Sequence, residues 1–236
     1  MNLTDFIINA LPITFLELLA ALAGSFFLYK TRASKINKYL VLFLWITFFV
    51  EVIGAYAPLA YFSQYEYFSF VEGSLIEKNK WLYNCYSIYS YSFLTYYFLH
   101  YLRNSKLKWI LYIILIGFIV SCILNLIFSG IFFTADAQYA LLIGTALLVL
   151  SVILFYFELL QSDLILKLKQ FLPMYISVGV MVFSLCVTPV DIFSKYFSAG
   201  NDVYVSLRSN VYLYTNIFMY SIFILGFLIC ARKTSY

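Results

Sequence analysis

Four carboxyl side chains fall inside or at the ends of long apolar stretches, and they are the groups in this sequence best suited to chemistry: Glu17, Glu51, Glu158 and Asp191. An ionisable group inside a membrane span is energetically costly, which makes each of them a functional candidate. The alternative is a protonated or paired carboxyl that only holds helices together. Glu17 and Glu51 are predicted to lie deepest, so for them we favour the functional interpretation. Glu158 and Asp191 lie nearer the ends of their stretches, where a structural pair is favoured, as between Asp191 and Arg208.

The second polar feature is the stretch from Trp81 to Leu102, in which seven residues are tyrosine and four more are Ser or Thr. One stripe of this stretch, drawn as a helix, collects Tyr83, Tyr86, Ser90, Phe93, Tyr97, His100 and Tyr101. Hydroxyl groups need hydrogen-bond partners inside hydrocarbon. The stretch is therefore predicted to be a central helix with other helices packed around its tyrosine stripe.

We combine these groups into one predicted binding site between helices. Its members are the two deep carboxyls, three residues of the tyrosine stripe and one amide from the last apolar stretch: Glu17, Glu51, Tyr86, Ser90, Tyr97 and Asn216. No basic residue is predicted at the depth of the two glutamates, and burial favours the neutral form of a carboxyl. Tyrosine hydroxyls and the Asn216 amide are therefore their expected hydrogen-bond partners.

The residues needed for several familiar chemistries are missing. His100 is the single histidine, so a multi-histidine metal site cannot form, and the four cysteines have the spacing of neither a zinc site nor a disulfide framework. The last apolar stretch has no lysine for a retinal Schiff base, and no Ser-His-Asp set, Walker loop or dinucleotide fingerprint appears. We therefore expect no metal and no cofactor, and we assign no catalytic residue.

The elements that must position these groups are membrane-spanning helices. Of the 236 residues, 64% are hydrophobic and only 11% are charged, whereas a soluble domain is roughly half apolar and a quarter charged. At roughly 20–25 residues per span, the sequence predicts an all-α polytopic membrane protein with seven transmembrane helices in one domain, residues 1–236. The predicted helices run at about residues 6–29, 39–62, 81–102, 109–130, 137–160, 171–194 and 207–231.

Two of these helices carry local signals. The first has a face of small and polar residues that includes Glu17 and Gly24, and such faces allow close helix approach in membranes, so Glu17 is predicted to point into the bundle. In the second, Pro58 leaves the Gly54 carbonyl without its helical N–H partner. A kink or loosened turn is therefore predicted just beyond Glu51.

The fifteen basic residues set the predicted orientation. Eleven lie in alternate connections, in groups of four, three, two and two: residues 30–38, 103–108, 167–169 and 232–233. The positive-inside rule then places the amino terminus outside and the carboxyl terminus in the cytoplasm of a multi-pass inner-membrane protein. Small basic groups between apolar runs do not make a nucleic-acid surface, so nucleic acid is excluded as a partner.

Two short motifs carry a resemblance. The sequence EVIGAY, from Glu51 to Tyr56, is followed about 25 residues later by WLYNCYS, from Trp81 to Ser87. This pair resembles a group of seven-helix membrane proteins of Bacteroidota, over the second and third predicted helices. Relatives in that group often have Glu where Ser90 stands here, so a role of that carboxyl does not carry over. The resemblance implies the seven-helix architecture and no particular activity.

Three functions fit these predictions. The first is sensing: a polar, aromatic site between helices binds a small molecule or a lipid, and a change in helix packing is passed to a separate cytoplasmic partner protein. The second is a proton-coupled transporter or channel that uses Glu17 and Glu51. The third is a lipid-modifying membrane enzyme with a carboxylate as general acid or base. We favour the first and lean against an enzyme, because the sequence has a kink-prone turn beside Glu51 and no catalytic set.

The predicted topology is tested with reporter fusions placed after residues 34, 105, 165 and 236. Each fusion should report a cytoplasmic location, because each lies within or beside a group of basic residues on the predicted inner side. A periplasmic signal from any one of the four would contradict the predicted number of spans before it.

Overall fold

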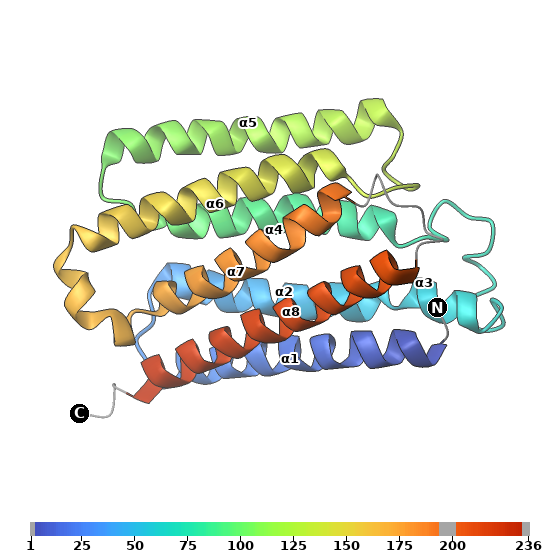
Figure 1. Cartoon of the computed structure of the whole chain (residues 1–236), viewed down its shortest axis with the longest axis horizontal. Helices are drawn as coiled ribbons and strands as arrows, with labels where there is room; N and C mark the ends of the chain where they lie inside the picture. Colours follow the sequence, from blue (N-terminus) through green and yellow to red (C-terminus); the bar gives the residue numbers. More distant parts are fainter. Residues whose placement is uncertain (1–2, 194–201, 233–236) are drawn as a thin grey trace. The chain divides into compact units, whose positions relative to one another are not determined.

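The structure is a computed structural model that describes residues 3–193 and 202–232, and within those residues it is all-helical (Figure 1). The elements in chain order are α1 (Leu3–Lys30), α2 (Lys35–Gly54), α3 (Tyr56–Phe62), α4 (Lys80–His100), α5 (Ser105–Ser129), α6 (Gln138–Leu160), the 3₁₀ helix η1 (Asp163–Gln170), α7 (Leu172–Phe193) and α8 (Asp202–Ala231). The all-α prediction is confirmed for this part of the chain. The predicted helices differ from the observed ones by a few residues at their ends, and η1 was not predicted.

Six helical segments are long and apolar enough to cross a membrane: Ala10–Lys30, Lys35–Phe62, Ser105–Ser129, Gln138–Leu160, Leu172–Phe193 and Val203–Ala231. Helix α4 has 21 residues, which is enough to span a bilayer, but its many tyrosines and serines lower its hydropathy. The described residues therefore form a helical bundle of the kind found in membrane proteins, with six segments that could span a bilayer. That α4 is a seventh span, and that the amino terminus lies outside, both stay predictions.

The helix that carries Glu51 is interrupted one turn later. Helix α2 ends at Gly54 and α3 begins at Tyr56, with a turn at Ala55 between them. The cause is Pro58, which has no N–H to donate to the carbonyl of Gly54. The kink or loosened turn predicted just beyond Glu51 is confirmed.

The chain divides into two compact units, which we describe separately. Unit 1 comprises Met1–Trp45 and Tyr156–Tyr236, and unit 2 comprises Ile46–Phe155, so α2 and α6 each contribute residues to both.

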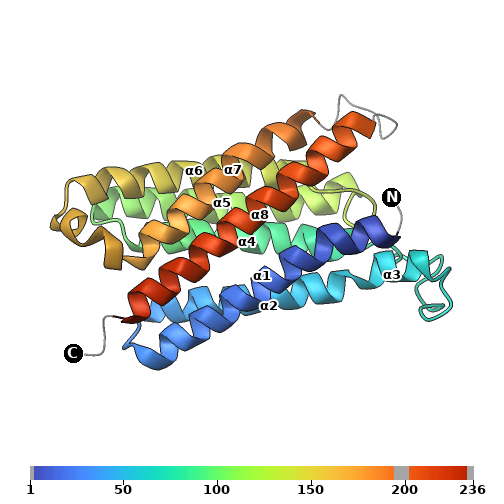
Figure 2. The ribbon, with the colours of Figure 1, turned by 60° about the horizontal axis from the view of Figure 1, so that its bottom comes forward.

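In unit 1, α8 lies alongside both α1 and α7 (Figures 1 and 2). Glycine allows this close packing at two points. A Cβ added to Gly24 of α1 would lie 2.8 Å from the Val41 side chain and 3.3 Å from the Phe227 ring. A Cβ added to Gly226 of α8 would lie 2.6 Å from Cβ of Tyr175 in α7. The small face predicted for the first helix therefore does pack against a neighbouring helix.

In unit 2, α4 and α5 are antiparallel neighbours joined by a short turn (Figure 1). Their shared core is apolar and continues into α6, with buried Leu99, Leu102, Leu111, Leu115, Phe118, Cys122, Leu126, Ala137, Ala140 and Leu147. Asn84 of α4 is a buried exception with its hydrogen bonds satisfied. It donates to the carbonyls of Phe132 and Ala135 and accepts from the N–H of Ala137, at 2.8–3.0 Å. The α5–α6 connection is thereby fixed to α4.

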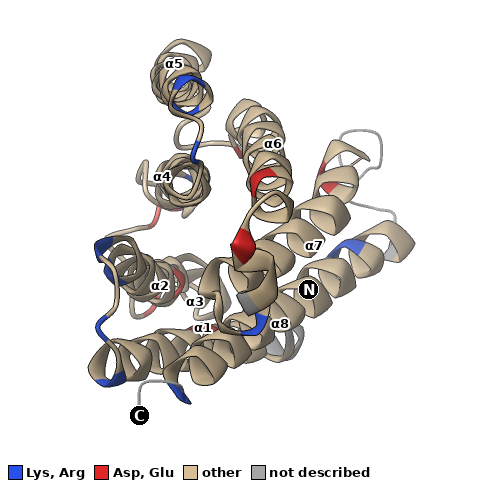
Figure 3. Ribbon diagram, turned by 90° about the vertical axis from the view of Figure 1, so that its left-hand side faces the viewer, with Lys and Arg blue, Asp and Glu red and all other residues tan. Residues whose placement is uncertain are grey.

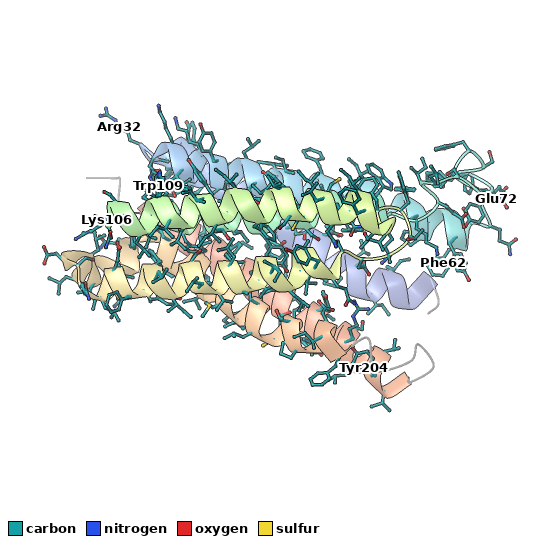
Figure 4. The ribbon with its side chains drawn as sticks, turned by 90° about the horizontal axis from the view of Figure 1, so that it is seen from above. Arg32, Phe62, Glu72, Lys106, Trp109 and Tyr204 are labelled. Atoms are coloured by element: carbon teal, nitrogen blue, oxygen red, sulfur yellow. The ribbon has the colours of Figure 1, made fainter. Side chains whose placement is uncertain are left out.

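Charged residues gather at the ends of the helices within each unit. In unit 1, Lys and Arg surround the turn between α1 and α2, and in unit 2 they surround the turn between α4 and α5 (Figure 3). Figure 4 shows that Lys106 and Trp109 lie at one end of unit 2, whereas Phe62 and Glu72 lie at the other. Within unit 2, the basic connection and the acidic connection are therefore separated by the length of the helices.

A comparison of two helical glycines tests the packing in unit 1. Gly24→Leu should destabilise the protein by about 1–3 kcal/mol, since a side chain there collides with Val41 and Phe227. Gly117→Leu is the matched control, because nothing lies within 4 Å of a Cβ at Gly117 in α5. The measurement is thermal unfolding of both variants in the same detergent. Equal melting temperatures would place Gly24 at a lipid-facing position.

Candidate functional site

Unit 2 contains a row of hydrogen bonds between side chains that join α2 and α3 to α4. Thr47 and Tyr86 share a hydrogen bond of 2.7 Å between their hydroxyls. Further along, the Tyr83 hydroxyl donates to Glu51 Oε2 at 2.9 Å. Residue numbers rise along one helix as they fall along the other, as expected for antiparallel helices whose facing residues recur every three or four positions.

Two more bonds continue this row past the helix break. Asn79 Nδ2 donates to the Gly54 carbonyl at 2.8 Å, and Trp81 Nε1 donates to the Tyr56 hydroxyl at 3.0 Å. We call the whole row the α2–α4 seam, with members Thr47, Glu51, Gly54, Tyr56, Asn79, Trp81, Tyr83 and Tyr86.

The seam supplies the hydrogen bond that Pro58 removes. The Gly54 carbonyl would accept from residue 58 in a regular helix, and it accepts from Asn79 instead. Asn79 occupies the N-cap position of α4, where an asparagine side chain usually binds the N–H groups of its own helix. Here its side chain makes no such bond. Asn79 therefore does not cap its own helix, a contribution that is typically about 1 kcal/mol. Its side chain instead connects α4 to the break in the other helix.

Gly54 has a second role in the seam. A Cβ at this position would lie 2.6 Å from the Tyr83 hydroxyl oxygen and 3.0 Å from the ring carbon that carries it. Glycine is therefore required for Tyr83 to pass over the end of α2 and reach Glu51. The resemblance motif EVIGAY contains both the carboxyl and this glycine.

Glu51 is more exposed than Glu17 and has one side-chain hydrogen bond. It is partly buried, and the one hydrogen bond that its side chain makes within the described residues comes from Tyr83 to Oε2. No Lys or Arg of the described chain forms an ion pair with it. Its Oε1 is thus left for a further donor, and its negative charge, when present, has no countercharge from the protein.

The seam joins its helices through long side chains. Within unit 2 the close backbone approach is between α4 and α5, and α2 does not approach α4 as closely among the described residues. A contact made of hydroxyl, amide and carboxyl groups at the tips of side chains can exchange partners without repacking an apolar core. This property distinguishes the seam from the rest of unit 2.

Next to the seam, four aromatic rings continue along α4. The ring centroids are 6.4 Å apart for Tyr86 and Tyr89, 6.2 Å for Tyr89 and Phe93, and 6.4 Å for Phe93 and Tyr97. Tyr89 is 36% exposed, whereas Tyr97 is fully buried. We call these four residues the α4 aromatic ladder. It is accessible near the seam and closed at its Tyr97 end.

Glu17 lies in unit 1 and is enclosed. It is 3% exposed, and its Oε1 accepts a hydrogen bond of 3.0 Å from the hydroxyl of Tyr220, which is itself 5% exposed. The expected partner Asn216 instead donates to the carbonyl of Tyr212 in its own helix at 2.8 Å. The expectation for Asn216 is wrong by one turn of α8, because Tyr220 is the stripe residue that stands level with Glu17. This pair has the features of a structural lock between α1 and α8.

The six residues of the predicted site divide between the two units. Glu17 and Asn216 belong to unit 1, and the other four belong to unit 2. Of those four, Glu51 and Tyr86 are members of the seam, and Tyr97 is a member of the α4 aromatic ladder. Ser90 is partly buried and follows Tyr86 by one turn, with no hydrogen bond to a seam residue. The single site spanning all six residues stays a prediction.

The pairing expected near the end of the sixth predicted helix is confirmed. Arg208 Nη2 lies 3.2 Å from Asp191 Oδ1, and the Tyr212 hydroxyl donates to Asp191 Oδ2 at 2.5 Å. The guanidinium also lies over the Tyr212 ring, 5.5 Å from its centroid. Asp191 is therefore neutralised and hydrogen-bonded by two residues of α8, which supports the structural interpretation preferred for it.

Sequence reasoning missed Tyr83, Asn79, Thr47 and Tyr220 as members of these sites. Tyr83 lies on the predicted tyrosine stripe but was not selected, and Tyr220 follows the selected Asn216 by one helical turn. Thr47 stands four residues before Glu51, a spacing that places both on one face of α2. Asn79 lies in the connection before α4, where no periodicity marks it.

Comparison with protein-family models, with curated proteins and with solved structures finds no match for this chain. The class of the protein therefore rests on its helices and composition, and the likeness of EVIGAY and WLYNCYS to the Bacteroidota group stays a resemblance.

Substitutions at Glu17 test its structural role. Glu17→Gln should be tolerated, because an amide oxygen can still accept from Tyr220. Glu17→Leu should destabilise the protein by about 1–3 kcal/mol, since it leaves a buried tyrosine hydroxyl without its acceptor. Thermal unfolding in detergent measures both, with Glu72→Leu as the control at an exposed position. A Leu variant as stable as wild type would show that Tyr220 is satisfied by another group.

Proposed function

We propose that this chain is an integral membrane protein that senses a small molecule or a lipid by binding it at the α2–α4 seam. The observation that supports the proposal most directly is the position of Glu51. It accepts a hydrogen bond from Tyr83 of α4, and the helix that carries it is broken at Ala55, one turn further on. The Glu51–Tyr83 bond, which a ligand could replace, thus lies beside a helix break that can change its geometry.

The Glu51–Tyr83 contact and the helix break are coupled because the Tyr83 side chain takes part in both. Tyr83 touches both Glu51 and the end of α2 at Gly54, and the carbonyl of Gly54 is held from α4 by Asn79. A ligand that donates to Oε1 of Glu51, or brings a positive charge there, lowers the negative charge on Oε2 and so weakens its bond with the Tyr83 hydroxyl. When Tyr83 leaves, Gly54 loses the ring packed against it, and the segment from the break to Phe62 becomes free to reorient. The ligand can shift this equilibrium only by its differential affinity for the two arrangements.

The signal is then passed to a separate cytoplasmic protein. The described residues of this chain are helices and short connections, so the proposed output is a change in helix packing that a partner protein reads. The bilayer is its other partner.

A second function, proton-coupled transport, is favoured by one observation. Glu51 has no cationic side chain as partner among the described residues, so it can alternate between a neutral and a charged form with each proton gained or lost. No observation favours the third function, a lipid-modifying enzyme.

Hydrogen–deuterium exchange of residues 54–62 tests the sensing proposal, with the protein in lipid nanodiscs. Tyr83→Phe removes the hydroxyl that reaches Glu51 and should raise exchange in this segment severalfold, because the break loses one of the contacts that hold it to α4. Asn79→Ala should do the same. Tyr139→Phe is the matched control, since it removes a tyrosine hydroxyl bonded to Ser121 between α5 and α6.

The same variants separate the two functions. Native mass spectrometry should find a co-purified ligand on the wild type and on Tyr139→Phe, and lose it with Glu51→Gln. Proton flux into liposomes that disappears in Glu51→Gln, without ligand loss, would support transport instead. Equal exchange in Tyr83→Phe and Tyr139→Phe would contradict a role of the seam in controlling the break.

A further inference from the structure

The charge balance around Glu51 restricts what the seam can bind. The seam members that face it are neutral: Thr47 on its own helix, and Tyr83 and Tyr86 on α4. Lys80, at the start of α4, lies 2.7 Å from Asp136 Oδ1 and is neutralised there. The acidic Glu77 of the preceding connection accepts from Tyr65 and from the N–H of Gly73. Lys78 of the same connection is exposed, and neither it nor Lys80 forms an ion pair with Glu51 among the described residues.

The α4 aromatic ladder supplies the second half of the argument. Aromatic faces attract cations, and the attraction grows when the site is removed from water. Tyr86 hydrogen-bonds to Thr47, which precedes Glu51 by one turn of α2, so the ladder starts about one helical turn from the level of the carboxyl. Tyr89 follows, with a 36% exposed side chain, and Tyr89 and Phe93 are nearly parallel at an interplanar angle of 24°.

These two features select between ligand classes. An anion would meet the carboxylate with no basic residue to receive it. A neutral polyol could donate to Glu51 Oε1, but it would pair neither with the negative charge that the carboxyl carries when ionised nor, as a cation does, with the ring faces. A cation with an apolar surface satisfies both the carboxylate and the aromatic faces.

We infer that the ligand of the α2–α4 seam carries an ammonium group, held between the Glu51 carboxylate and the ring faces of Tyr86 and Tyr89. This inference rests on the proposed function and names its ligand class. The group can belong to a free amine or to the headgroup of an amino lipid, since both present the same cation. Binding adds a donor or a positive charge at Glu51 Oε1 and so weakens the hold of Glu51 on Tyr83.

Choline and its neutral isostere 3,3-dimethylbutan-1-ol form the test pair, because they share shape and a hydroxyl and differ in charge. The protein is placed in nanodiscs of phosphatidylglycerol, which has no amine, and binding is measured by saturation-transfer NMR. Choline should bind the wild type at least tenfold more tightly than the isostere. Glu51→Gln and Tyr89→Leu should each remove most of this preference, and Tyr139→Leu, at a tyrosine of α6 outside the seam and the ladder, should leave it unchanged.

The lipid source is tested by adding phosphatidylethanolamine to the nanodiscs. Competition that weakens choline binding in the wild type and not in Glu51→Gln assigns the site to a headgroup, and its absence assigns the site to a free amine. Either result is consistent with the inference.

Three outcomes would overturn the inference: choline and its isostere binding equally, choline binding that Glu51→Gln does not weaken, or no binding of choline at millimolar concentration. None of them decides the proposed function, because the exchange difference between Tyr83→Phe and Tyr139→Phe is measured without any added ligand. Failure of that difference, with choline bound through Glu51, would leave an ammonium site that does not control the break.

Discussion

A polar group inside a membrane must find its hydrogen-bond partner in the protein, and this constraint organises both units of the chain. Water is not available there to replace a missing partner, so each buried hydroxyl, amide or carboxyl dictates where a neighbouring helix must stand. The Glu51–Tyr83 bond at 2.9 Å and the Glu17–Tyr220 bond at 3.0 Å are two instances of one solution, a carboxyl on one helix and a phenol on the next. They differ in access, since Glu17 is enclosed and Glu51 retains exposure.

That difference bears on what each pair can do. A sealed pair between α1 and α8 has a well-packed surrounding, with Gly24 pressed against Val41 and Phe227. Opening it would require several helices to separate. The seam in unit 2 is held at the tips of side chains, next to a helix that is already interrupted. The pair in unit 1 would therefore be costly to open, whereas the seam in unit 2 can change conformation. This is expected when binding elements are drawn from the less stable regions of a fold.

Local features of the fold were readable from the sequence, whereas the pairing of side chains was not. The break beyond Glu51 follows from Pro58, because the missing N–H affects a carbonyl four residues away in the same helix. The partner of that carbonyl is different: Asn79 lies 25 residues further on, and its bond depends on how far α4 extends and how it is rotated. Asn216 was predicted as a hydrogen-bond partner of the deep glutamates, whereas Tyr220 is the partner of Glu17, and this pairing too depends on how two helices are aligned. Both residues lie on one stripe of α8, and only the axial alignment of α8 with α1 decides between them.

The composition of α4 has a consequence for how the protein is made. A helix with this many hydroxyl groups is a poor substrate for insertion on its own, since the machinery that inserts nascent spans sorts them largely by hydrophobicity. Its partners come from both directions along the chain: the seam residues precede it, and the α5–α6 connection held by Asn84 follows it. Such a segment is expected to wait near the insertion machinery until α5 emerges, and to enter the bilayer with it as a hairpin. The tyrosines that define the seam would then also set the order in which unit 2 is assembled.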